Sequence, residues 1–186
     1  MISSFDREIR TQIAAALSGA LGVAVETRSV RLPARQSDAG VSIPHGCDGA
    51  RAQRADFGSL WGAPLVSSVH PFNGWLLFTF SDAFFDSLVA RINASLPLPE
   101  NDGGSRAVNR MLALGRHGGE GCPSVPALKR ALLEALQAGR SPAAYRRAAR
   151  AVETMFHTVP PRERPAILPR SGALGNALAR LLGSVP

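Results

Sequence analysis

The sequence predicts an α+β protein in which a small N-terminal α/β unit with an antiparallel hairpin is followed by a C-terminal helical bundle. Three observations support this prediction. An Asn-Gly pair separates two β-rich runs, a Pro- and Gly-rich stretch interrupts the chain at 97–104, and every later segment has helical periodicity. We therefore expect two domains, covering residues 1–98 and 99–186.

The N-terminal unit is expected to begin with a helix over residues 4–20, where apolar residues recur every fourth position. These residues are Phe5, Ile9, Ile13 and Leu17. A short half-buried strand is then expected over 23–32, from Val23, Val25, Val30 and Leu32. Residues 33–49 are rich in Pro, Gly, Ser and Asp and are interpreted as a loop, followed by a short helix or irregular segment over 50–61.

The clearest local signal is Asn73-Gly74, which lies between the apolar runs 65–69 and 75–80. Both residues tolerate positive φ, so the pair predicts a tight hairpin turn. The second run is apolar on both faces and should form a central strand. Ser81 is expected to cap a helix that extends to about Asn93. The buried stripe of that helix should consist of Phe84, Phe85, Leu88, Val89 and Ile92.

The C-terminal half should contain helices only. The first is expected over 105–116 and the second over 124–138, with Gly139 as its end. A third should begin at Ser141-Pro142, with Ser141 as the N-cap and Pro142 at the first helical position, where proline is favoured. It is expected to bury Tyr145, Ala149, Val152 and Phe156. A break at Pro160-Pro161 should precede a last helix that contains Leu174, Leu178, Leu181 and Leu182.

The composition predicts a globular cytoplasmic protein. Of the 186 residues, 45% are hydrophobic and 19% charged, as is usual for a folded domain. Cys47 and Cys122 are the only cysteines, too few for a disulfide framework, which indicates a reducing compartment. The first residues lack the basic patch and apolar run of a signal peptide. No apolar stretch approaches the length of about 20 residues that spans a bilayer, so no membrane partner is expected.

The basic charge lies entirely in the second half of the chain. Residues 1–100 hold eight Arg against nine Asp plus Glu, a net charge of −1. Residues 101–186 hold thirteen Lys plus Arg against five acids, a net charge of +8. Lys129 is the only lysine among them. Such an asymmetry indicates that this half binds a polyanion.

No arrangement of residues predicts catalysis or a cofactor. His45 with Cys47, and His117 with Cys122, are residue types that zinc prefers, but neither pair has the spacing of a zinc ribbon. His70 and His157 could act as bases, yet no nucleophile motif accompanies them. The glycines at 103–104 and 118–121 lack the Gly-Lys-Ser/Thr ending of a phosphate loop. We expect neither a metal nor a cofactor.

An arginine cluster is the strongest candidate for a binding site. Helical spacing places Arg150 on adjoining surface with Arg146 or with Arg147, and guanidinium groups suit phosphate oxygens. The alternative interpretation is a solvated helix face. The residues predicted to bind RNA are Lys129, Arg130, Arg140, Arg146, Arg147 and Arg150.

Two parts of the chain resemble the arginyl-tRNA synthetase family. From Leu65 to Ile92 there is a strand, the turn Pro71-Phe72-Asn73-Gly74, a strand ending Phe78-Thr79-Phe80, and a helix beginning Ser81-Asp82. This order resembles the end of the N-terminal tRNA-recognition domain of that family. The helical half is similar to its DALR anticodon-binding domain, through residues 106–116, 143–157 and 174–182.

The catalytic domain of that family is missing from the resemblance. Only the linker at 97–104 lies where the synthetase carries it, and no His-Ile-Gly-His-like or Lys-Met-Ser-Lys-Ser-like sequence occurs. The resemblance therefore implies a noncatalytic binding protein that meets tRNA or another structured RNA through its basic helical half. The alternatives are a protein–protein interaction or structural module with no nucleic-acid role and, third, a small enzyme using His157 or the loop of His45 and Cys47.

Overall fold

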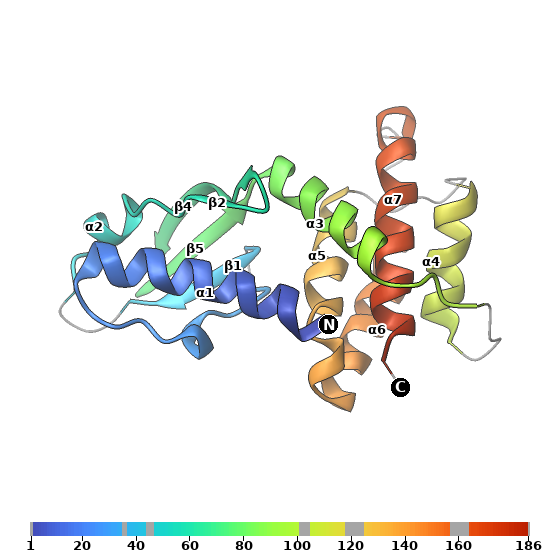
Figure 1. The fold of residues 1–186 in the computed structure, drawn as a ribbon, viewed down its shortest axis with the longest axis horizontal. Helices are drawn as coiled ribbons and strands as arrows, with labels where there is room; N and C mark the ends of the chain where they lie inside the picture. The colour runs from blue at the N-terminus through green and yellow to red at the C-terminus, as the bar shows by residue number, and fades with distance from the viewer. Residues whose placement is uncertain are drawn as a thin grey trace. The chain divides into compact units, whose positions relative to one another are not determined.

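The protein is an α+β protein, as the sequence predicts. A computed structural model describes residues 2–34, 37–43, 47–100, 105–117, 125–156 and 164–185. The chain divides into two compact units, residues 3–87 and 88–186 (Figure 1). The first unit contains all the described strands, and the second is helical in its described part.

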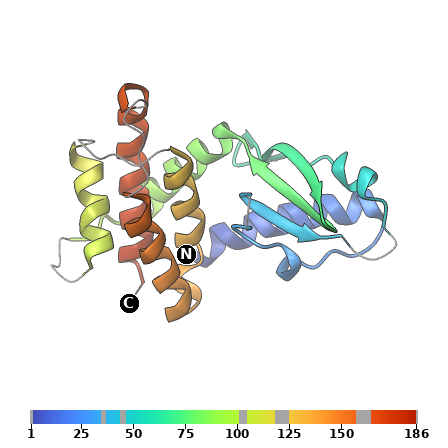
Figure 2. The ribbon, with the colours of Figure 1, turned by 180° about the vertical axis from the view of Figure 1, so that it is seen from behind.

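The first unit packs one long helix against an antiparallel sheet. Helix α1 (Ile2–Leu21) lies along one face of the sheet (Figure 1). The predicted apolar stripe of this helix is confirmed, since Phe5, Ile9, Ile13 and Leu17 are all buried. Figure 2 shows the sheet from the other side, where none of the described helices of this unit covers it. The core of the unit therefore lies between α1 and one face of the sheet.

The sheet has the strand order β1-β5-β4. Its strands are β1 (Ala39–Ser42), β4 (Val66–Phe72) and β5 (Trp75–Phe80). The predicted central position of the 75–80 run is confirmed. Burial alternates along this strand, with Leu76, Phe78 and Phe80 facing the core. Strand β5 is therefore central in the sheet, but only one of its two faces is fully buried.

The predicted hairpin turn is confirmed at Asn73-Gly74. Phe72 pairs with Trp75 across it, and the two turn residues have φ angles of 47° and 76°. Strand β4 continues to Phe72, beyond the predicted end at 69, and so includes Pro71. Proline is tolerated there because β4 is an edge strand, which pairs with β5 alone among the described strands.

We expect Gly74→Ala to lower the free energy of unfolding by about 1 kcal/mol, because a left-handed backbone strains a residue with a Cβ atom. Gly139 provides the matched control, since its backbone has no positive φ and an added Cβ would meet open space. Gly139→Ala should be neutral or stabilise the protein by about 0.5 kcal/mol. Urea unfolding of both variants measures the difference. Equal stabilities would show that the turn does not require Gly74.

Two sequence predictions for the first unit are wrong. No strand covers 23–32; instead Thr27–Ser29 form the short 3₁₀ helix η1, and Arg31 makes only an isolated bridge to Gly40. Val23 is exposed, whereas Val30 and Leu32 are buried. The predicted loop at 33–49 contains β1, which owes its order to its antiparallel pairing with β5.

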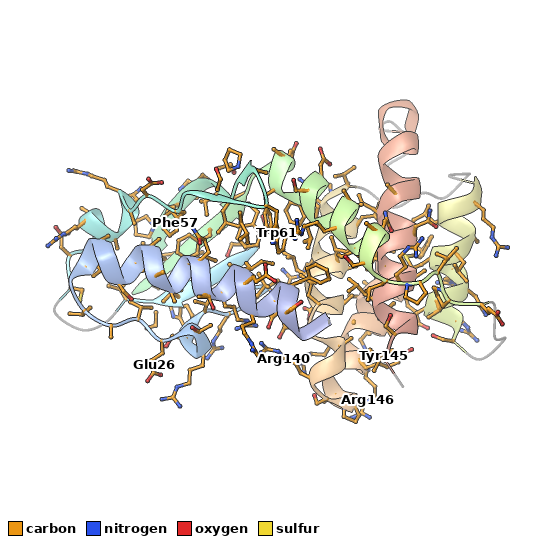
Figure 3. All side chains as sticks on the ribbon, viewed as in Figure 1. Glu26, Phe57, Trp61, Arg140, Tyr145 and Arg146 are labelled. Carbon is orange, nitrogen blue, oxygen red and sulfur yellow. The ribbon has the colours of Figure 1, made fainter. Side chains whose placement is uncertain are left out.

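An aromatic cluster fills the space between α1 and the sheet. The indole of Trp61 stacks on Phe84 with ring centroids 5.6 Å apart, and Phe57 meets Phe78 edge-on at 5.1 Å (Figure 3). Phe57 lies in the loop that follows the short helix α2 (Gly49–Gln53). Trp61 lies in the turn between the strands of a small sheet, β2 (Ser59–Leu60) and β3 (Ala63–Pro64).

Helix α3 (Asp82–Ser95) begins as predicted, because the Ser81 hydroxyl accepts a hydrogen bond from the Phe84 amide at 3.0 Å. The predicted stripe of Phe84, Phe85, Leu88, Val89 and Ile92 is buried. The division between the compact units falls inside this helix, between Ser87 and Leu88. Asn93, in its second half, donates to the carbonyl of Ala173 and accepts from Arg180 within the second unit.

The second unit is built around its last helix. Helix α7 (Arg164–Gly183) packs against α4 (Arg106–His117) on one side and α5 (Val125–Ala135) on the other (Figure 1). Leu174, Leu178, Leu181 and Leu182 are buried, as predicted for this helix. None of the helices in the described residues is long and apolar enough to cross a membrane.

The predicted stripe of helix α6 (Pro142–Met155) is confirmed at Val152 and is wrong by one residue at its other three positions. The buried positions are Ala144, Ala148, Val152 and Met155. Tyr145 is only half-buried, and its hydroxyl lies 3.1 Å from the Ser105 hydroxyl. Alanines at the buried positions let α6 approach the helices around it closely, whereas a ring such as that of Tyr145 would hold them apart. The Ser141 cap is confirmed, since its hydroxyl accepts from the Ala144 amide.

Candidate nucleic-acid interface

Helices α5 and α6 form a helical hairpin that carries all six predicted RNA-binding residues. The two helices pack against each other and are joined through the 3₁₀ helix η2 (Ala138–Arg140). Leu128, Leu132 and Leu136 point into the bundle, as the sequence predicts. Because neighbouring helices in a hairpin run in opposite directions, residues near the end of α5 lie opposite residues near the start of α6.

A groove of about 350 Å³ runs between these two helices. Its lining combines polar side chains, here called the rim, with apolar side chains, here called the floor. The rim carries Arg130, Glu134, Arg147, Arg150 and Thr154, and the floor consists of Ala127, Ala131, Ala151 and Met155. The floor exists because the alanines leave the space that larger side chains would fill.

Three of the six predicted residues line this groove and three do not. Arg130 comes from α5, and Arg147 and Arg150 come from α6, so guanidinium groups of two helices are brought together. All three are exposed. Arg140 and Arg146 lie near the connection between the helices (Figure 3), and neither they nor Lys129 line the groove.

The sequence analysis missed the regular spacing of the groove residues. On α5 they are Ala127, Arg130, Ala131 and Glu134, which occupy positions i, i+3, i+4 and i+7 of one helix face. On α6 the spacing repeats with Arg147, Arg150, Ala151 and Thr154. Selecting basic residues by this spacing would have separated Arg147 from its neighbour Arg146. It would also have drawn attention to Glu134, the acid on the same face.

The charges of Arg147, Arg150 and Glu134 are not neutralised within the groove. Among the residues that the structure describes, neither Arg147 nor Arg150 forms an ion pair, and the Glu134 carboxylate forms none either. Arginine side chains that stay exposed and unpaired keep their donors available to a ligand. The groove can therefore accept an anion on its arginine side and present an acceptor from Glu134.

The other candidate residues are not brought together in the described structure. His45, Cys122 and His157 lie outside the described residues. Within the parts that are described, no group of three or more His, Cys, Asp or Glu side chains is placed to hold a metal ion. His70 lies exposed on the edge strand β4, and Cys47 is a half-buried free thiol.

Comparison with known proteins gives no relative, since no family model, curated protein or solved structure matches the chain. The resemblance to arginyl-tRNA synthetases stays a prediction from the sequence. Any functional assignment has to be argued from the groove itself.

Proposed function

We propose that this protein is a noncatalytic RNA-binding protein whose α5–α6 groove holds RNA phosphates. The observation that carries the proposal is the convergence of Arg130, Arg147 and Arg150 from two helices on one groove. The net charge of +8 over residues 101–186 supports it, because a basic half attracts a polyanion at long range. The synthetase-like order of elements makes tRNA the first RNA to test.

The test compares two variants that remove the same charge from the same helical hairpin. The groove variant carries Arg130→Gln, Arg147→Gln and Arg150→Gln, and the control variant carries Lys129→Gln, Arg140→Gln and Arg146→Gln. Each lowers the formal net charge from +7 to +4. Circular dichroism and thermal unfolding of both variants check the fold. Five of the six residues are exposed and Lys129 is half-buried, and exposed substitutions cost within about 0.5 kcal/mol each.

We expect the groove variant to bind tRNA about a hundredfold more weakly at 0.1 M salt. Each phosphate contact contributes about 0.7 to the slope of log affinity against log salt, so three contacts give a slope of about 2, which corresponds to about two decades of affinity between about 1 M and 0.1 M salt. The salt slope should fall by about 2, whereas the control variant should stay within about threefold of the parent protein. Fluorescence anisotropy with labelled tRNA over a salt series measures both quantities. Equal losses in the two variants would show that overall charge, and not the groove, holds the RNA.

A protein-interaction role is the second candidate, and one observation favours it. Phe72 is 50% exposed at the end of the hairpin, beside Trp75 on the side of the sheet that none of the described helices of the first unit covers. Exposed aromatic residues are common in protein interfaces. If the parent protein fails to bind RNA even at low salt, this second role replaces the first.

A further inference from the structure

The α5–α6 groove contains a carboxylate that phosphate binding does not explain. Glu134 lines the groove together with Arg147 and Arg150, and within the described residues it forms no ion pair. A carboxylate beside a phosphate site repels the phosphate, so an arginine groove that binds only phosphates would be stronger without it. An ionised carboxylate can only accept hydrogen bonds. Its presence in the groove therefore indicates a ligand that also offers donors.

The floor of the groove indicates a flat apolar group. Ala127, Ala131, Ala151 and Met155 form it, and thioether and methyl groups pack well against an aromatic ring. The volume of about 350 Å³ lies at the small end of the range of ligand pockets, about 300–1,000 Å³. One unstacked nucleotide fits such a space, whereas a base-paired helix does not. Proteins that recognise RNA sequence bind splayed-out bases of this kind.

We propose that the groove takes one unpaired guanine nucleotide of the bound RNA. The base lies on the alanine floor, Arg147 and Arg150 hold the flanking phosphates, and the Glu134 carboxylate accepts from the Watson–Crick edge. Guanine presents two adjacent donors there, the N1–H and the 2-amino group, which match the two carboxylate oxygens. Adenine and cytosine present one amino group, and uracil presents one N–H between two carbonyls. This inference rests on the proposed RNA-binding function and adds the base that the site selects.

The test uses single-stranded heptamers with three uridines on each side of a central guanosine, inosine, adenosine, cytidine or uridine. Inosine differs from guanosine only by the missing 2-amino group. The full-length protein should bind the guanosine heptamer about tenfold more tightly than the others, because a bidentate pair discriminates by a factor of about 5 to 150. Anisotropy titrations at one salt concentration give the ratios.

Two variants test whether Glu134 and the floor produce this preference. Glu134→Gln should reduce the ratio of the guanosine and inosine heptamer affinities to within about twofold. The all-uridine heptamer should bind as tightly as before or more tightly. Ala151→Met fills the groove without changing its charge. It should also abolish the preference for guanosine and keep the slope of log affinity against log salt. Glu153→Gln is the matched control, since Glu153 is exposed on α6 and does not line the groove, and it should keep the preference.

The outcomes separate the two proposals. Salt-dependent binding of all heptamers without a preference for guanosine overturns the guanine site and leaves phosphate binding by the arginines standing. A preference that survives both Glu134→Gln and Ala151→Met places the recognition of guanine elsewhere and also overturns the inference. If no heptamer and no tRNA binds, both proposals fail together.

Discussion

Replacing Asp6 by Ala should lower the free energy of unfolding by about 3–5 kcal/mol. Asp6 on α1 is completely buried and accepts a hydrogen bond from Nε of Arg10 at 2.7 Å. The Arg10 guanidinium also donates to the carbonyl of Val30, so it is held in the core on two sides. Without Asp6, the buried Arg10 guanidinium has no ion-pair partner among the described residues, and the folded state bears the cost of desolvating its charge.

The pair Glu26 and Arg28 is the control for this prediction. Its side chains are 58% and 84% exposed. Hydrogen bonds from Arg28, and then its charge, hold the pKa of Glu26 below its ordinary value, but water screens an exposed pair. Glu26→Ala should leave the unfolding midpoint unchanged. Urea unfolding of both variants at neutral pH compares a buried pair with an exposed pair of the same chemistry.

A double variant separates charge from packing. Asp6→Ala with Arg10→Met removes the unpaired charge and keeps most of the side-chain volume, so it should recover part of the lost stability. A double variant no more stable than Asp6→Ala alone would show that lost packing, and not the buried charge, causes the effect.

Replacing Phe78 by Ala should lower the free energy of unfolding by about 3–5 kcal/mol. Phe78 is fully buried in the central strand β5 and contacts the ring of Phe57. Its removal loses apolar burial and leaves a cavity between α1 and the sheet. The next residue, Thr79, is exposed on the opposite side of the same strand, so Thr79→Ala should change stability by no more than about 0.5 kcal/mol.

Urea unfolding followed by circular dichroism measures both variants, and near-ultraviolet signals report the aromatic packing directly. Phe78→Ala should weaken those signals in the folded state, because Phe57 loses its partner. A loss below about 1 kcal/mol would mean that the sheet can collapse around the missing ring, against the close packing seen in this core.

Sequence reasoning succeeded where a few neighbouring residues decide the structure. The Asn73-Gly74 turn depends on two residues that accept positive φ, and the caps at Ser81 and Ser141 depend on one hydroxyl each. Strand β1 was missed because its residues, Ala39 to Ser42, have little tendency to form a strand by themselves. Pairing with β5, more than thirty residues later in the chain, gives β1 its order.

For the candidate site, the sequence indicated the right hairpin but not the right face. Six basic residues were selected because they are close in the chain, and the groove receives three of them. The difference follows from the buried stripe of α6, which contains Ala144, Ala148 and Met155 where the prediction had Tyr145, Ala149 and Phe156. The choice of Ala144 over Tyr145 as the buried residue goes together with the position of Arg147 in the groove and of Arg146 outside it. Such a choice depends on how closely two helices approach, which periodicity alone does not reveal.

The position of the unit boundary inside α3 limits where the chain can be cut into fragments or recombined with other genes. Phe84 and Phe85 belong to the first unit, and Leu88 and Ile92, on the same helix, belong to the second. A cut at the Pro-rich linker after residue 96 would leave the second half of α3 on the first fragment, where its apolar residues would lack the unit they pack in. The second fragment would lose part of its core. The units are therefore poor candidates for recombination as separate modules, and fragments made for study should overlap across the whole of α3.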